Sequence, residues 1–345
     1  MTPAQFQHII ALWKEGVINL SVPYSRYIFN LIPWYSFLIV LGVAIAVFLG
    51  IREEKYAGFK KDTFLDFALI ALPSGIIGAR IYYVVFTFEN FKDDILSVFR
   101  IWEGGIAIYG AIIAGVIAAG LFSIKRKISF WTLCDLAAPG LVLAQAIGRW
   151  GNYFNQEAYG LALQNPALCF FPFAVQIHES SGSVWHMATF FYESCWDFGV
   201  FVFLMIARRK WFRYRGDVIR FYGFLYACGR LIIEDFRLDS LYASSSARIS
   251  QLLSVVICAS VMIYYIVRFR FQHYSARNLM RAFLYAVLAA DVLSVFWMAG
   301  LFSPAITLAL RCFLLVSVSM LNITAFLLLY AICAEGEVVY ANNDR

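Results

Sequence analysis

Four stretches of the chain carry no charged residue over the length that a helix needs to cross a lipid bilayer. They are residues 31–51, 104–124, 249–267 and 312–334. A helix rises about 1.5 Å per residue, so roughly 20 apolar residues span a hydrocarbon core of about 30 Å. Further apolar segments, each interrupted by at least one ionisable residue, bring the expected spans to nine; they are residues 67–88, 128–148, 186–207, 218–233 and 282–302.

The composition excludes water-soluble enzymes and DNA-binding proteins. Hydrophobic residues make up 62% of the 345 residues and charged residues 14%, whereas soluble domains have roughly 45–50% and about 25%. The mean hydropathy is +0.72. The seven cysteines include no CxxC pair and lie mostly in apolar runs, so the sequence indicates neither a disulfide framework nor a metal site.

The formal charge of +6 describes orientation rather than a nucleic-acid partner. Lysine and arginine gather in the segments 52–61, 125–127, 208–220 and 268–281, while the opposing loops hold few of them: Lys92, Arg100, Arg149, Arg237 and Arg248. Basic loops stay on the cytoplasmic side of a membrane. The pattern therefore predicts an outside N-terminus and, with nine spans, an inside C-terminus.

These features predict an all-α, polytopic transmembrane bundle in three parts. Residues 1–30 are expected to form an amphipathic segment on the outer membrane surface, because apolar side chains recur in them without a cleavable signal. Seven of the nine expected spans lie in residues 31–270, with a folded outer loop expected at about 152–185. The other two lie in residues 271–345, ahead of a short tail.

Ionisable residues inside the spans gather toward one expected depth, near the outer ends. Arg80, Tyr109 and Arg149 lie at such ends. A fourth group occupies one helical stripe because its members are spaced three to four residues apart: Tyr226, Arg230, Glu234 and Arg237. Charged groups at bilayer depth are costly, so a functional site is the default interpretation once a partner is plausible.

Two interpretations of this polar group stay open. Arg230 and Glu234 can form an intrahelical ion pair that neutralises itself. Alternatively, Arg80 and Arg149, which have no carboxylate beside them in the sequence, leave an excess of guanidinium groups for an anion. The anion abundant at that depth is a phospholipid phosphate, which arginine binds through two parallel hydrogen bonds. His186 is expected to be a capping or packing residue.

Thirteen residues that follow the fourth span, from Gly148 to Gly160, read GRWGNYFNQEAYG. This segment resembles the signature of the bacterial prolipoprotein diacylglyceryl transferases. Support comes from segments in matching order between about Trp34 and Val267; they begin at Gly78, Gly104, His186 and Gly229.

The resemblance implies an enzyme of the bacterial cytoplasmic membrane with its active site toward the outer leaflet. Such an enzyme moves the diacylglyceryl group of phosphatidylglycerol onto the lipobox cysteine of a prolipoprotein signal peptide. It forms a thioether, releases glycerol phosphate and needs no metal or organic cofactor. Nucleic acid is not an expected partner.

By the same resemblance, two sets of residues are expected at the site. The expected catalytic residues are Arg149 and Arg230 as a phosphate clamp, Glu157 and Glu234 as groups that orient the arginines, and Tyr109. The expected substrate-binding residues are Tyr35, Arg80, Asn152, Asn155, Gly160, Tyr226 and Arg237.

Three features depart from the family pattern. Tyr109 stands where many members carry a histidine proposed as the base, and Pro33 and Ser36 replace the usual arginine and glycine. The family has seven spans, so the resemblance makes residues 31–270 a seven-span transferase core, and the two-span extension after about Phe271 has no counterpart. Two rival interpretations remain: a noncatalytic lipid-binding or lipid-moving protein, and a related transferase with another donor or acceptor.

Overall fold

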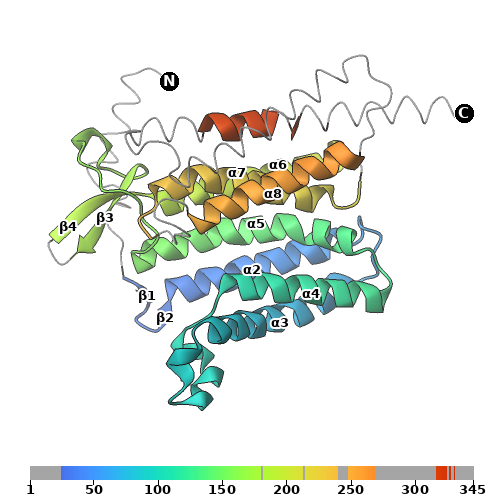
Figure 1. Ribbon diagram of the computed structural model, residues 1–345, viewed down its shortest axis with the longest axis horizontal. Coiled ribbons are helices and arrows are strands. Elements are labelled where there is room, and N and C mark those ends of the chain that lie inside the picture. The colour runs from blue at the N-terminus through green and yellow to red at the C-terminus, as the bar shows by residue number, and fades with distance from the viewer. Residues whose placement is uncertain are drawn as a thin grey trace, which may run out of the picture. The chain divides into compact units, whose positions relative to one another are not determined.

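The computed structural model describes residues 25–179, 182–212, 214–239 and 248–268, and from the C-terminal part residues 316–324, 326, 327 and 330. The expected amphipathic segment before residue 25 and the expected span at 282–302 lie outside these residues. The described chain is mostly helical (Figure 1). The helices are α2 (Trp34–Glu53), α3 (Thr63–Phe86), α4 (Ile108–Arg126), α5 (Phe130–Asn155), α6 (Thr189–Lys210), α7 (Asp217–Ile233) and α8 (Ile249–Arg268).

The prediction of a polytopic membrane protein is confirmed. Among the described residues, the helices α2 to α6 are each long and apolar enough to cross a membrane, and residues 249–265 form a shorter apolar helix. Large apolar side chains such as Ile77 on α3 and Ile117 on α4 are more than half exposed. Such surfaces suit lipid rather than water.

The expectation of an all-α fold needs one correction, because two small antiparallel hairpins accompany the helices. β1 (Tyr27–Ile28) pairs with β2 (Ile32–Pro33) ahead of α2. β3 (Ala174–Glu179) pairs with β4 (Gly182–Met187), in register from Ala174 opposite Met187 to Glu179 opposite Gly182. The second hairpin gives the expected outer loop its fold. Backbone outside the bilayer is free to pair between strands, whereas a spanning segment must satisfy its own hydrogen bonds.

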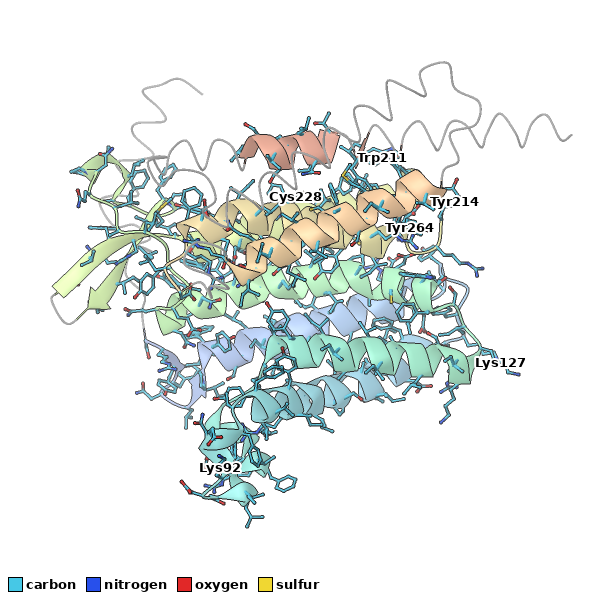
Figure 2. All side chains as sticks on the ribbon, viewed as in Figure 1. Lys92, Lys127, Trp211, Tyr214, Cys228 and Tyr264 are labelled. Carbon is cyan, nitrogen blue, oxygen red and sulfur yellow. The ribbon has the colours of Figure 1, made fainter. Side chains whose placement is uncertain are left out.

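The chain divides into two compact units. The smaller comprises residues 43–141 and 214–219, and within it α3 and α4 lie side by side (Figure 1). In Figure 2, Lys92 and Lys127 mark opposite ends of this helix pair. A Cβ on Gly78 would stand 2.7 Å from the carbonyl oxygen of Gly110, so close helix packing requires both glycines.

The larger unit comprises residues 1–42, 142–213 and 220–345. Within it α6, α7 and α8 run side by side (Figure 1). The Trp196 indole on α6 donates to the Leu225 carbonyl on α7 at 2.9 Å. The Gln251 amide on α8 donates to the Leu231 carbonyl at 3.1 Å.

The described helical residues between 316 and 330 pack against α7 and α8. The Phe326 ring is 1% exposed and lies 4.4 Å from the Phe224 ring and 5.3 Å from the Tyr265 ring, measured between centroids. The Tyr330 hydroxyl donates a hydrogen bond to the backbone carbonyl of Trp211, and the Ser319 hydroxyl donates one to the backbone carbonyl of Cys228. Figure 2 labels Trp211 and Cys228. This part of the extension therefore contributes to the core of the larger unit.

We expect Phe326→Ala to destabilise the protein by roughly 1–3 kcal/mol. The loss is smaller than the usual 3–5 kcal/mol for a buried phenylalanine, because lipid also solvates the ring. Thermal unfolding in detergent micelles measures the effect. Leu327→Ala is the matched control, since Leu327 is 42% exposed, and an equal loss in both variants would contradict the packing described.

Candidate functional site

A single buried carboxylate, that of Glu193, collects three arginine side chains. Glu193 is 3% exposed, and its Oε2 lies 2.8 Å from Nε of Arg149. Its Oε1 contacts the guanidinium of Arg230 and lies 3.5 Å from Nη1 of Arg237. These residues together with Glu234, which also contacts the Arg230 guanidinium, form the arginine cluster.

The helix directions bring the cluster together. Arg149 lies near the C-terminal end of α5, Glu193 in the second turn of α6, and Arg230 near the C-terminal end of α7. The C-terminal ends of α5 and α7 therefore meet the N-terminal end of α6. Because α7 ends at Ile233, Glu234 lies in the short 3-10 turn η5 (Glu234–Phe236), and Arg237 is extended.

The expectation that Arg149 has no carboxylate partner is wrong. Glu193 is 44 positions away in the sequence, and only the packing of α6 against α5 brings it to Arg149. The expected Arg230–Glu234 ion pair is present, but Arg230 also contacts Glu193. Each guanidinium carries five N–H donors, and the carboxylates of Glu193, Glu234 and Asp239 balance the three positive charges. A further anion with several oxygens can therefore bind by displacing a carboxylate from its N–H donors.

Arg237 connects the cluster to the surface. Its Nε and Nη2 donate to the Asp239 carboxylate at 3.0 and 2.8 Å. Burial alone would lower the pKa of Arg237 and raise the pKa of Asp239. The hydrogen bonds between them and the attraction of the surrounding opposite charges together outweigh burial, so the pKa of Arg237 lies above its usual value and the pKa of Asp239 lies below its usual value. Both groups stay charged at neutral pH.

The signature loop is held by amide and carboxylate contacts. Asn152 and Asn155 both donate to Oε1 of Glu157, at 3.4 and 3.2 Å. The side-chain Oδ1 of Asn155 accepts a hydrogen bond from Nε of Arg26 at 3.1 Å. Glu157 was expected to orient the arginines, but its carboxylate accepts hydrogen bonds from the two amides. It therefore fixes the directions in which Asn152 and Asn155 present their polar atoms.

Gly160 ends this loop where three segments meet. Its N–H donates to the Met187 carbonyl at 2.9 Å, and it pairs with Arg237 as an isolated β-bridge. A Cβ at this position would stand 2.8 Å from the Phe236 carbonyl oxygen and 2.7 Å from the Thr189 methyl carbon. Only glycine fits, so Gly160 holds Arg237 and the signature loop together.

His186 is a packing residue, as the sequence predicts. It lies in β4, is 3% exposed, and its Nδ1 is 2.8 Å from the Gly160 carbonyl oxygen. Its ring centroid is 4.6 Å from that of Tyr159. His186 therefore holds the end of the signature loop through its contacts with Gly160 and Tyr159.

Tyr35 and Tyr226 lie near the cluster. Tyr35 packs over Gly151, where an added Cβ would meet its ring at 2.6 Å, and the charges of Glu157 and Arg149 act on its hydroxyl. Tyr226 lines a narrow cavity together with Glu193 and Arg230. Both tyrosines therefore lie close to the arginine cluster.

Arg80 and Tyr109 belong to the smaller unit. Arg80 donates to the carbonyl oxygens of Val98 at 2.8 Å and Gly105 at 2.8 Å, and also to those of Ser97 and Gly104. Arg80 therefore fixes the segment that leads into α4. The sequence could not reveal this role, because every residue has a backbone carbonyl. The Tyr109 ring lies 6.3 Å from the Tyr82 ring. Their roles toward substrate stay predictions.

Two site residues were absent from the predicted set. Glu193 stands between Tyr192 and Ser194 in one of the segments that carry the resemblance, and Asp197 follows one turn later on α6. Both are acidic residues inside an apolar run and both are buried. The depth argument that selected the arginines, applied to acidic residues, would have found them.

Comparison with known proteins gives one consistent family. A family model described as prolipoprotein diacylglyceryl transferase matches residues 26–267. A phosphatidylglycerol–prolipoprotein diacylglyceryl transferase of Enterococcus faecalis is 43% identical over 240 residues, which cover 69% of this chain and 86% of that protein. A protein of the same name from Streptococcus agalactiae serotype Ia is 44% identical over 245 residues, covering 71% of this chain and 94% of that protein.

Proposed function

The chain belongs to the prolipoprotein diacylglyceryl transferase family, and we propose that it transfers the diacylglyceryl group of phosphatidylglycerol to the lipobox cysteine of prolipoproteins. The observation that carries the chemistry is the convergence of Arg149, Arg230 and Arg237 on the one buried carboxylate of Glu193. An array of fixed cations beside an exchangeable carboxylate suits a lipid phosphate.

The reaction explains why fixed cations are needed. The cysteine sulfur attacks the glyceryl carbon, a carbon–sulfur bond forms, and the carbon–oxygen bond to phosphate breaks. The bonding electrons leave with the phosphate oxygen, so glycerol phosphate gains negative charge as it departs, and the proton lost by the thiol ends on the released glycerol phosphate. Guanidinium groups already in place stabilise that charge without reorganising at the moment of reaction.

We assign the roles from the contacts. Arg149 and Arg230 hold the phosphate, which takes the position of Glu193 oxygens on their N–H groups. Glu234 keeps Arg230 oriented while Glu193 moves, because its contact is independent of Glu193. Around this clamp the headgroup site is shaped by Tyr35, Asn152, Asn155, Gly160, Tyr226 and Arg237.

We further propose the membrane arrangement of these helices. In this proposal α2 to α8 are the seven spans of the core, and the basic segments between them face the cytoplasm, so that the cluster lies toward the outer leaflet. Phosphatidylglycerol reaches that depth from the surrounding leaflet, and the prolipoprotein cysteine arrives there after translocation.

Purified protein with phosphatidylglycerol and a lipobox peptide tests the function. We expect a thioether-linked diacylglyceryl peptide and one glycerol phosphate per peptide, and no product from a peptide with serine in place of cysteine. Bound lipid without glycerol phosphate release would instead support a noncatalytic lipid-binding protein. Activity only with another phospholipid or acceptor would support the related-transferase alternative.

Tyr109→Phe should lower turnover without changing the shape of its pH dependence. Tyrosine is a poor general base at neutral pH, so we assign Tyr109 a hydrogen bond to headgroup or thiol. Turnover measured between pH 6 and 9 for both proteins decides. Loss of an ionisation in the variant, with lipid binding unchanged, would identify Tyr109 as the base.

A further inference from the structure

Asp197 is a buried acidic residue that has no role in the reaction described above. It lies on α6 four residues after Glu193, so the two carboxyl groups share one face of the helix. Asp197 is 2% exposed, and its Oδ2 has no hydrogen-bond partner among the described residues. It lines the same narrow cavity between α6 and α7 as Tyr226 and Arg230.

The neighbouring carboxylates differ from Asp197 because each has partners. Glu193 contacts three arginines, and Glu234 contacts Arg230. The charges of Arg149 and Arg230 act on Asp197 from a distance, but both guanidinium groups have a direct contact with Glu193 instead. A buried polar atom without a hydrogen bond costs free energy. An incoming group with a hydrogen-bond donor recovers that cost.

The donor lipid carries such a group, if the proposed function holds. A phosphate bound to Arg149 and Arg230 replaces Glu193, and rotation of that side chain widens the cavity toward Asp197. Along α6, Asp197 is displaced from Glu193 by about 6 Å, which is four residues at 1.5 Å each. A glycerol headgroup extends from its phosphate over a similar distance and ends in hydroxyls.

We propose that Asp197 accepts a hydrogen bond from a hydroxyl of the glycerol headgroup and thereby selects a polyol phospholipid as the diacylglyceryl donor. A site built to bond a hydroxyl discriminates against a headgroup that lacks one, because the buried oxygen is then left without its partner. Arg149 and Arg230 bind the charge common to all phospholipids. Asp197 reads the part that differs between them.

The test compares two donors with the same charge, phosphatidylglycerol and phosphatidylethanol, whose headgroup has no hydroxyl. For each, kcat/KM is measured in the wild type, Asp197→Ala and Asp197→Asn. We expect the preference for phosphatidylglycerol to fall about 10- to 100-fold in Asp197→Ala, with kcat/KM for phosphatidylethanol nearly unchanged. Asp197→Asn keeps a neutral acceptor, so its preference should fall only about three- to tenfold.

An equal loss for both donors would overturn the proposal and make Asp197 a packing residue. If the alanine variant does not fold, the donor preference of Asp197→Asn alone decides. Asp66→Asn is the control for the amide substitution, because Asp66 is exposed and contacts Arg126; its donor preference should equal that of the wild type. A wild type inactive with phosphatidylglycerol would refute the proposed function instead.

Discussion

Arg149→Lys and Arg230→Lys should each lower transferase turnover at least about tenfold, equivalent to roughly 1.4 kcal/mol of transition-state stabilisation. Lysine keeps the positive charge but lacks the planar fork that holds two phosphate oxygens. It also cannot bridge two acidic groups in the way that Arg230, which contacts Glu193 and Glu234, does. Initial rates of glycerol phosphate release measure the effect.

Arg126→Lys provides the matched control. Arg126 is an exposed residue near the C-terminal end of α4 that contacts Asp66, so the same chemical change there should leave turnover within twofold of the wild type. Wild-type rates in both cluster variants would show that geometry at Arg149 and Arg230 is unimportant and would refute the phosphate clamp.

Glu193→Gln should have the largest effect on stability. It leaves three guanidinium groups without their shared carboxylate, and loss of one partner of a buried ion pair typically costs about 3–5 kcal/mol. We expect a lower unfolding midpoint and lower turnover than in either lysine variant. Because phosphate supplies the missing charge, phosphatidylglycerol should raise the midpoint of this variant more than that of the wild type.

The control for this substitution is Glu103→Gln. Glu103 is exposed and lies 3.2 Å from the Arg100 guanidinium, and an exposed ion pair contributes little to stability. The unfolding midpoint of Glu103→Gln should therefore fall far less than that of Glu193→Gln. Equal shifts in the two variants would mean that Glu193 is not the centre of the cluster.

Helical spacing allowed part of the site to be predicted from the sequence. The four-residue interval between Arg230 and Glu234 gave their ion pair, and the charge-free runs gave the helices within a few residues. These predictions depend on local geometry alone. They hold because an apolar run in lipid has few alternatives to a helix.

Contacts between helices could not be predicted in the same way. Glu193 reaches Arg149 and Arg230 only because α6 packs against α5 and α7, and no regular interval in the sequence announces that packing. Arg80 was expected at an anion site, yet its donors meet backbone carbonyls, which every residue possesses. The β3–β4 hairpin packs Val175 and Ile177 into one cluster with Tyr153 of α5 and Phe190 of α6. The sequence of the loop alone does not reveal that packing.

Binding of the lipid phosphate by the arginine cluster can be measured through the unfolding midpoint in micelles that contain equal mole fractions of phosphatidylglycerol or diacylglycerol. Phosphatidylglycerol should raise the midpoint of the wild type and diacylglycerol should not, because only the former carries a phosphate. Arg149→Lys and Arg230→Lys should lose most of this increase. An undiminished increase in both variants would show that the phosphate binds elsewhere.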